Sequence, residues 1–456
     1  MSTKLETKTI TEYLDQDYRE YAVYVVEERA IPSVIDGFKP TQRKVIFVAD
    51  KVWRGGTEKP LKIFQLAGKV ASDASYHHGD ASLSGAIIGM AQKFKNSMPV
   101  LDEIGQFGAL RSPEAGAPRY ISTKLHPNFR QLYMDFDLLT PRYEEGSEIE
   151  PKYFLPIIPT VLLNGGSGIA VGFATNILNR NPIDLIESCL KVIDGKPFNE
   201  PSPWYYGFSG ECKQDSENRM AWIFKGKYEI KNTSSVEVTE LPPSMTYEKY
   251  DTYLNQLEDT KKIVGYENHC KSDIKYLLKF RREDLKKLQD TDKLDKFLKN
   301  EERQSENLTV LDENGDLKIF NNSTEIIKYF VDFRLKYYIK RKDFLIKKLG
   351  NELMVLSNRA NFIKSIIDGK LKVNNVPRKD IILYLETANF DQVEGGYSYL
   401  LNMQIHTLTK EKYEELLSTT REKELELESI KKKEPSNMYK EDLNHLKKAL
   451  LKSYSK

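Results

Sequence analysis

The segment Ala115-Gly116-Ala117-Pro118-Arg119-Tyr120-Ile121-Ser122-Thr123 places a tyrosine beside an arginine, between a stretch of small residues and a β-prone run. The phenolic oxygen of Tyr120 can attack phosphorus, and the planar cation of Arg119 can hold a phosphate oxygen through two hydrogen bonds. The chain has 26 tyrosines, so a second interpretation stays open from this segment alone: an amphipathic tyrosine in a core or an interface.

The composition is that of a multidomain protein without a strong overall charge. The 456 residues are enough for about two to four domains. The net charge of +2 means that only the distribution of basic residues can point to a nucleic acid. The three cysteines lack metal-binding spacing, which argues against zinc. Met1–Glu6 does not resemble a signal peptide and no apolar run reaches membrane-spanning length, so we expect a cytoplasmic protein without membrane contact.

Three helices near the N-terminus form a candidate DNA-binding module. Apolar residues recur at helical spacing over Thr11–Arg29 before Pro32 ends the helix, and a second helix begins near Thr41. Asp80 is a suitable N-cap for a third helix, which carries one apolar stripe and an opposite face of small residues: Ala81, Ser82, Gly85 and Gly89. Such a face suits a helix-turn-helix or winged-helix surface on DNA, or equally a tight contact with another helix.

The chain changes character from Glu150 onward. Prolines and the glycine-rich run Leu162–Gly172 indicate short strands and turns. The run lacks the Gly-Lys-Ser/Thr ending of a P-loop and the spacing of a dinucleotide fingerprint, so we exclude nucleotide binding there. From its residue type alone, Ile169 within this run would be a core residue. The pattern predicts an α+β domain that extends to about residue 322.

A helical pattern begins at Thr324. The seam positions of a coiled coil recur at steps of three and four residues: Leu345, Leu349, Leu353, Leu356, Ala360, Ile363 and Ile367. Gly369 and Pro377 interrupt the helix, a small helical globule follows, and Thr409 caps a returning helix. We interpret this region as an antiparallel stalk with a terminal globule, which serves as a dimerisation or spacer element.

Together these segments resemble the DNA breakage-reunion subunit of type IIA DNA topoisomerases, the class of gyrase A and topoisomerase IV. The strings similar to the eukaryotic enzyme are Tyr76–Asp80, Ile104–Gly108, Ala117–Ile121 and Leu408–Lys412, and those similar to the bacterial enzyme are Asp36–Pro40 and Asn164–Gly172. This mixture, the short length and the bare ends resemble the medium subunit of T4-type phage topoisomerases.

The resemblance implies a role for each matching residue. Tyr120 would be the nucleophile that forms a 5′-phosphotyrosyl link, and a free tyrosine, with a pKa near 10, needs cationic help to attack at neutral pH. The implied catalytic set is Tyr120, Arg119, Arg29 and His78. The implied DNA-binding set is Lys39, Arg43, Lys44, His77, Ser82 and Ile169, in which Ile169 would wedge between base steps and bend the DNA.

The resemblance also implies a multidomain α+β fold. Its parts would be a winged-helix breakage-reunion domain at 1–145, an α/β tower domain at 146–322, and a coiled-coil stalk at 323–456 with a C-gate globule at about 370–410. Two copies would form a homodimer through the winged-helix region and the C-gate, because one tyrosine opens only one strand of a duplex.

The sequence shows no acidic cluster of the Asp-x-Asp type that follows a glutamate-bearing strand, and no ATP-binding motif. In the family, Mg²⁺ and ATP are bound elsewhere, so we expect both on a partner ATPase and metal-binding subunit, with this chain binding neither and inactive alone. We see no resemblance to a DNA-wrapping domain and therefore expect ATP-dependent relaxation or decatenation of double-stranded DNA during DNA replication, in a bacterial host if the chain is phage-encoded.

Two other interpretations remain. A non-catalytic winged-helix protein that bridges DNA through a coiled-coil dimer would explain the basic helices and the stalk, but neither the Arg119–Tyr120 pair nor the Ile169 turn. A coiled-coil scaffold without DNA would explain still less.

Overall fold

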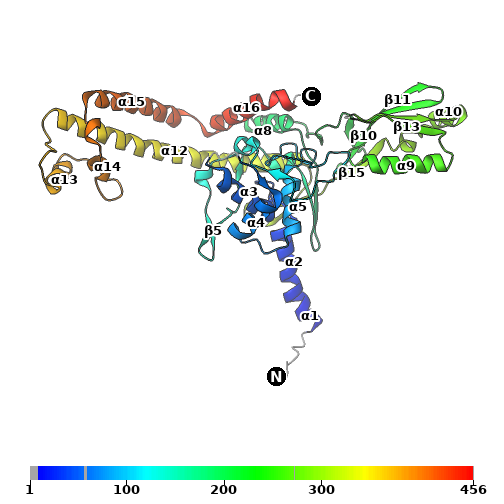
Figure 1. Cartoon of the computed structure of the whole chain (residues 1–456), viewed down its shortest axis with the longest axis horizontal. Coiled ribbons are helices and arrows are strands. Elements are labelled where there is room, and N and C mark those ends of the chain that lie inside the picture. Colours follow the sequence, from blue (N-terminus) through cyan, green and yellow to red (C-terminus); the bar gives the residue numbers. More distant parts are fainter. Residues whose placement is uncertain (1–8, 56–58, 272, 455–456) are drawn as a thin grey trace. The chain divides into compact units, whose positions relative to one another are not determined.

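The computed structural model describes residues 9–55, 59–271 and 273–454 and shows a mixed α/β chain (Figure 1). The chain divides into two compact units: residues up to Arg334 together with those from Asp442 onward, and Leu335–Glu441. The segment Met1–Glu6, which does not resemble a signal peptide, lies outside the described residues. None of the described helices is long and apolar enough to cross a membrane.

The first unit begins with a helical run that ends before Pro32, as the sequence predicts. Its successive parts are α1 (Ile10–Glu12), η1 (Tyr13–Tyr18), α2 (Arg19–Val25) and η2 (Val26–Ala30), of which η1 and η2 are π-helical. Thr9 caps the run by accepting a hydrogen bond from the Glu12 amide at 3.2 Å. Only the last turns are buried, where Val25, Val26 and Ala30 pack against Ile31 and Leu311.

Three mutually packed helices follow: α3 (Pro40–Trp53), α4 (Ile63–Asp73) and α5 (Asp80–Ala91). A short antiparallel pair, β1 (Leu61–Lys62) with β2 (Ser122–Thr123), lies beside α4. The predicted cap of α5 is wrong by one residue: Gly79 has the extended N-cap backbone, and Asp80 is the first helical residue. There its carboxylate still lies at the positive end of the helix dipole.

The two faces of α5 differ as the sequence predicts. Leu83, Ile87 and Met90 are buried in the core. On the opposite face, a Cβ atom added at Gly85 or Gly89 would meet nothing within 4 Å. Among the described residues, Gly85 and Gly89 of α5 therefore have no closely packed helix beside them.

A buried carboxylate ties the segment between η2 and α3 to the rest of the unit. Asp36 is completely buried, and its side chain accepts two hydrogen bonds from Arg43 at 2.7 and 3.0 Å. It also accepts hydrogen bonds from the backbone amides of Phe38 and Phe154. Because Phe154 is distant in the sequence, this carboxylate connects two parts of the chain that meet only on folding.

The middle of the chain consists of short elements. They are α6 (Pro127–Leu132), β3 (Tyr133–Met134), η3 (Phe136–Leu138), β4 (Arg142–Glu144), β5 (Ser147–Ile149), β6 (Leu155–Pro156), α7 (Thr160–Leu163), β7 (Gly166–Ile169), β8 (Ala174–Ile177) and α8 (Pro182–Ile193). The boundary expected near residue 145 does not separate two compact units, since the β4–β5 hairpin pairs Arg142 with Ile149 across it and β3 pairs with β6.

Two antiparallel sheets follow in the same unit. The first has the order β15-β10-β9, from β9 (Glu211–Gln214), β10 (Ala221–Lys225) and β15 (Glu301–Ser305); the second has the order β11-β12-β14-β13, from β11 (Lys227–Asn232), β12 (Ser235–Glu240), β13 (Gly265–Asn268) and β14 (Tyr276–Lys279). Helices α9 (Tyr247–Asp259), α10 (Arg282–Asp290) and α11 (Leu294–Phe297) contribute to one core with β12 and β14. The hairpin of β16 (Leu308–Leu311) and β17 (Leu317–Phe320) leads to the long helix α12 (Ser323–Ile367).

The second unit contains most of α12 and a helix that returns along it. Gly369, with a φ of 72°, follows the end of α12. The small cluster of α13 (Arg378–Thr387) and α14 (Ser398–Leu401) comes next, followed by η4 (Ile405–Thr407), α15 (Lys410–Lys432) and α16 (Pro435–Tyr454). Thr409 caps α15 as predicted. The two long helices are antiparallel, because Glu352 pairs with Lys423 at 3.3 Å and Ile363, further along α12, packs with the earlier Leu416.

Asp36→Asn should destabilise the first unit strongly. The substitution leaves the Arg43 cation buried without its counter-charge, which typically costs about 3–5 kcal/mol. The free energy of unfolding, measured in urea, should fall by this amount. Glu148→Gln is the matched control, since it breaks the exposed Lys51–Glu148 pair and should cost less than about 1 kcal/mol. Equal effects of the two substitutions would contradict this role for Asp36.

Candidate nucleic-acid interface

Tyr120 projects from a tight turn directly before strand β2. Its amide donates to the Ala117 carbonyl at 2.9 Å, and its own carbonyl accepts from the Lys62 amine at 2.9 Å. The next residue, Ile121, is buried, whereas the Tyr120 side chain is 72% exposed. A tyrosine held by its backbone with its ring in solvent is not a core residue of this chain. The phenolic oxygen is therefore accessible to a large substrate.

The loop that carries Tyr120 is anchored at both ends. Near its start, Gln92 donates from its side chain to the Phe107 carbonyl at 2.7 Å. Near its end, Gly116 donates to the Gln106 carbonyl and packs against Ile121. Arg119 is exposed and forms no ion pair with any described residue. Its guanidinium is thus available to an anion from outside the chain.

A second group of predicted residues surrounds the hairpin of β7 and β8. Arg29, Lys39 and Ile169 line one hollow of about 370 Å³. Ile169 is 88% exposed at the end of β7, so the interpretation of Ile169 as a core residue is wrong. An isoleucine exposed to this extent, in a hollow that two cations also line, is an unusual feature that suits an apolar contact with a partner.

Close backbone packing holds this hollow together. A Cβ atom at Gly168 would lie 2.1 Å from the Ala30 carbonyl oxygen, so only glycine lets the hairpin lie against the end of η2. Lys39, the N-cap residue of α3, donates to the Ser167 carbonyl at 2.8 Å. Burial lowers the pKa of the Lys39 amine, because removal from water disfavours its charged form.

His77 and His78 line another hollow, of about 340 Å³, together with Lys44. The Tyr24 hydroxyl and the His78 Nε2 atom share a hydrogen bond of 2.7 Å, and the Tyr76 ring lies edge-on to His78. The sequence did not indicate Tyr24 or Lys62 as members of the site. Only the folded chain brings them to His78 and to Tyr120, so no local pattern could have indicated them.

Two of the basic residues expected on the DNA surface have other partners. Arg43 is buried and donates to Asp36 and to the Phe38 carbonyl. Lys44 donates to the Ala74 carbonyl and to Glu150, with only 15% of its side chain exposed. The structure therefore gives Arg43 an internal, structural position. Lys44 reaches the wall of a hollow but is already paired with a carboxylate. His77 and Ser82, in contrast, are exposed.

The chain does not bring all of the predicted residues into one site. Across the described residues, no hydrogen bond or ion pair links the side chain of Tyr120 or Arg119 with Arg29, Lys39 or His78. The structure thus contains an exposed phenol with an adjacent cation, and separately a hollow with two cations and an exposed isoleucine.

The side chains that could bind a metal ion are dispersed. Over the ranges that the structure describes, no group of three or more His, Cys, Asp or Glu side chains is placed to hold an ion. Mg²⁺ prefers several oxygen ligands, usually from carboxylates. The described side chains of this chain alone do not fit such a site.

Comparison with known proteins identifies the class to which this fold and site belong. The chain is a member of the family of the A subunits of DNA gyrase and topoisomerase IV, whose model matches residues 29–444. It is 35% identical to DNA topoisomerase 2-alpha of Gallus gallus, over 91% of this chain and 29% of that protein. It is 33% identical to the mitochondrial DNA topoisomerase 2 of Dictyostelium discoideum, over 98% of this chain and 35% of that protein.

A solved structure gives the same result for the fold. The crystal structure of the Plasmodium falciparum topoisomerase II DNA-binding, cleavage and re-ligation domain superimposes with a TM-score of 0.86 and 31% identity. The match covers 96% of this chain and 64% of that one. The chain spans about a third of the length of the two full-length relatives above.

Gly168→Ala should disrupt the hollow around Ile169. The added methyl group collides with the Ala30 carbonyl, and overpacking of this kind costs about 1–3 kcal/mol. Thermal unfolding should occur at a lower temperature. Gly166→Ala on the same strand is the control, because a Cβ atom there meets nothing within 4 Å. If both variants unfold at the same temperature, Gly168 does not act through this contact.

The Lys39 amine should lose its proton at a lower pH than an ordinary lysine. The direction follows from burial, which favours the neutral amine. NMR titration of lysine side-chain resonances, with Lys39→Arg to assign the signal, measures the midpoint. A midpoint at or above the ordinary lysine value of about 10.4 would contradict the buried environment described here.

Proposed function

We propose that this chain cleaves and rejoins duplex DNA through Tyr120. The observation that carries the proposal is the exposed Tyr120 beside Arg119, which has no ion-pair partner among the described residues, on an anchored loop of a chain that belongs to the gyrase A and topoisomerase IV family. The solved relative with the same fold is described as a DNA-binding, cleavage and re-ligation domain.

The chemistry is a transesterification. The Tyr120 oxygen attacks a backbone phosphorus and forms the new P–O bond while the bond to the 3′ oxygen breaks. The phenolic proton is lost, and the released 3′ oxygen takes up a proton to become a hydroxyl. The Arg119 guanidinium offsets the negative charge on the phosphate oxygens. Because the product is again a phosphodiester, attack by the 3′ hydroxyl reverses the reaction without a new energy source.

DNA would lie across the winged-helix region formed by α3, α4, α5 and the β1–β2 pair. The uncovered face of α5 with Ser82, the exposed His77 and the hollow of Arg29 and Lys39 support this placement. His78 would contact the cleaved strand. Ile169 would insert between base steps, and the cations beside it would hold the backbone of the bent duplex. Arg43 would not contact the DNA, because its guanidinium is buried.

Two copies of the chain would act together, because each tyrosine opens one strand. The antiparallel pairing of α12 with α15 supports a coiled-coil stalk, and the globule of α13 and α14 would form the C-gate through which a second duplex leaves. The homodimer would use both the winged-helix region and this gate. The result would be relaxation or decatenation of DNA.

Mg²⁺ and ATP would be bound by a partner subunit. The mixture of bacterial-like and eukaryotic-like strings favours the medium subunit of a T4-type phage topoisomerase, which would work in the cytoplasm of a bacterial host during DNA replication. A non-catalytic protein that bridges DNA is the second candidate, and it gives no reason for the exposure of Tyr120.

Tyr120→Phe should abolish covalent attachment to DNA while leaving binding intact. Only the nucleophilic oxygen is removed, so protein-linked breaks in end-labelled duplex should disappear after denaturation and protease treatment. Fluorescence anisotropy should report unchanged affinity. The assay contains the partner subunit and Mg²⁺, and Tyr143→Phe, at another exposed tyrosine, serves as control. Equal linkage in wild type and Tyr120→Phe would assign the nucleophile elsewhere, and no linkage in either would favour the bridging protein.

A further inference from the structure

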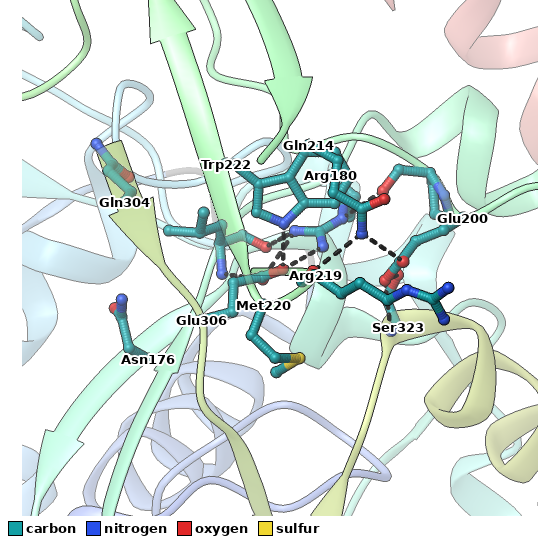
Figure 2. A network of polar contacts seen from close by, with 12 residues as sticks. Asn176, Arg180, Glu200, Gln214, Arg219, Met220, Trp222, Gln304, Glu306 and Ser323 are labelled. Atoms are coloured by element: carbon teal, nitrogen blue, oxygen red, sulfur yellow. Dashed lines mark hydrogen bonds and ion pairs between the residues drawn. The ribbon is translucent and has the colours of Figure 1, made fainter. Parts of the chain in front are cut away.

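A buried carboxylate lies where the Ile169 hairpin meets the sheet of β9, β10 and β15. The Glu306 carboxylate accepts hydrogen bonds from both terminal nitrogens of Arg180, at 3.0 and 2.7 Å. It also accepts one from the indole N–H of Trp222 at 2.9 Å (Figure 2). It also accepts the backbone amide of Leu178 at 2.9 Å. The Arg180 and Glu306 side chains are 0% and 2% exposed. One carboxylate thus satisfies four donors in a dry environment, which fixes their relative geometry.

The residues on either side of Glu306 hold the base of the hairpin. Asn176 in β8 and Asn307 exchange backbone hydrogen bonds, each of 2.9 Å. The Asn176 side chain donates to the Ser305 carbonyl at 2.6 Å. Leu178, whose amide binds Glu306, directly follows β8. The last residues of β8, the strand that returns from Ile169, are therefore hydrogen-bonded to residues 305–307.

The same network reaches the beginning of α12. Arg180 donates from Nε to the Pro201 carbonyl at 2.8 Å. The neighbouring Glu200 accepts both the amide and the hydroxyl of Ser323, each at 2.9 Å (Figure 2). Contacts therefore run from the first residue of α12 through the segment of Glu200 and Pro201 to Arg180, and on to the hairpin.

We propose that Glu306 and Arg180 are positioning residues for DNA bending, which hold the Ile169 hairpin rigid against the sheet and the start of α12. This inference rests on the proposed wedge role of Ile169. Insertion of the isoleucine between base pairs exerts a force on its hairpin. The DNA bends only if the hairpin does not move under this force. A buried ion pair, in which each N–H donor has an acceptor in a fixed direction, supplies that rigidity. An apolar contact of equal area does not, because it is not directional.

The test measures the DNA bend directly, in the Tyr120→Phe form of the chain so that no cleavage interferes. A short duplex carries a fluorophore at each end, and energy transfer at saturating protein reports the bend. Anisotropy gives the affinity, and thermal unfolding gives the stability. Glu306→Gln should lose at least half of the change in energy transfer, measured well below its unfolding temperature. Its affinity should change by less than about threefold, since the cations that hold the backbone are untouched.

Two further variants separate positioning from stability. Glu240→Gln removes another buried partner of an arginine, Arg111, away from the hairpin, and should be destabilised without loss of bending. The double variant Arg180→Met with Glu306→Leu removes both charges, so its stability should recover toward that of the parent. Its bending should stay low, because the Leu178 amide still lacks its acceptor.

Ile169→Ala distinguishes failure of this inference from failure of the proposed function. Loss of bending in Ile169→Ala and in both Glu306 variants supports the inference. Loss in Ile169→Ala alone, or normal bending in the double variant, overturns it and leaves the wedge role standing. Unchanged bending in Ile169→Ala, or no bending by the parent, overturns the wedge role and the inference with it.

Discussion

The Asp36 carboxylate, which is completely buried, binds Arg43 of α3 and the amides of Phe38 and Phe154. It fixes the segment between η2 and α3, and so places Lys39 where its amine reaches the hairpin at Ser167. A buried charge of this kind is tolerated only with a paired cation and satisfied hydrogen bonds. The hollow around Ile169 therefore depends on an interaction that never contacts DNA in the proposed function.

Three exposed residues of the interface, Tyr120, Arg29 and Ile169, each follow or precede a buried or closely packed neighbour. Ile121 is buried next to Tyr120, and Ala30 is buried next to Arg29. Gly168 lies against the η2 backbone next to the exposed Ile169. A side chain fixed at its backbone loses little further freedom on binding, so less entropy is lost when it meets a rigid partner such as duplex DNA. The interface thus combines exposure with rigidity, as a site acting on a large substrate requires.

The sequence indicated the residues whose environment is local. The Arg119–Tyr120 pair, the apolar stripe of α5, the end of the first helical run and the Thr409 cap follow from spacing and turn chemistry within a few residues. It failed where burial and the choice of partner decide the position of a side chain. Arg43 and Lys39 look alike as basic residues near one helix start, yet Arg43 faces Asp36 inside and only Lys39 reaches the hairpin. The cap of α5 was misplaced by one residue, since glycine and aspartate both suit that position.

The sequence by itself determined which elements form and which side chains have the chemistry to attack and hold phosphate, because propensities and functional groups are properties of short segments. It also carried the resemblance that the family match supports. Only the tertiary structure decided which cations stay free, that Ile169 is exposed, and that Glu306 joins the hairpin to Arg180 and Trp222. Burial depends on packing between distant segments, as where Leu178 and Arg180 meet Glu306 more than a hundred positions away, and no local pattern contains that information.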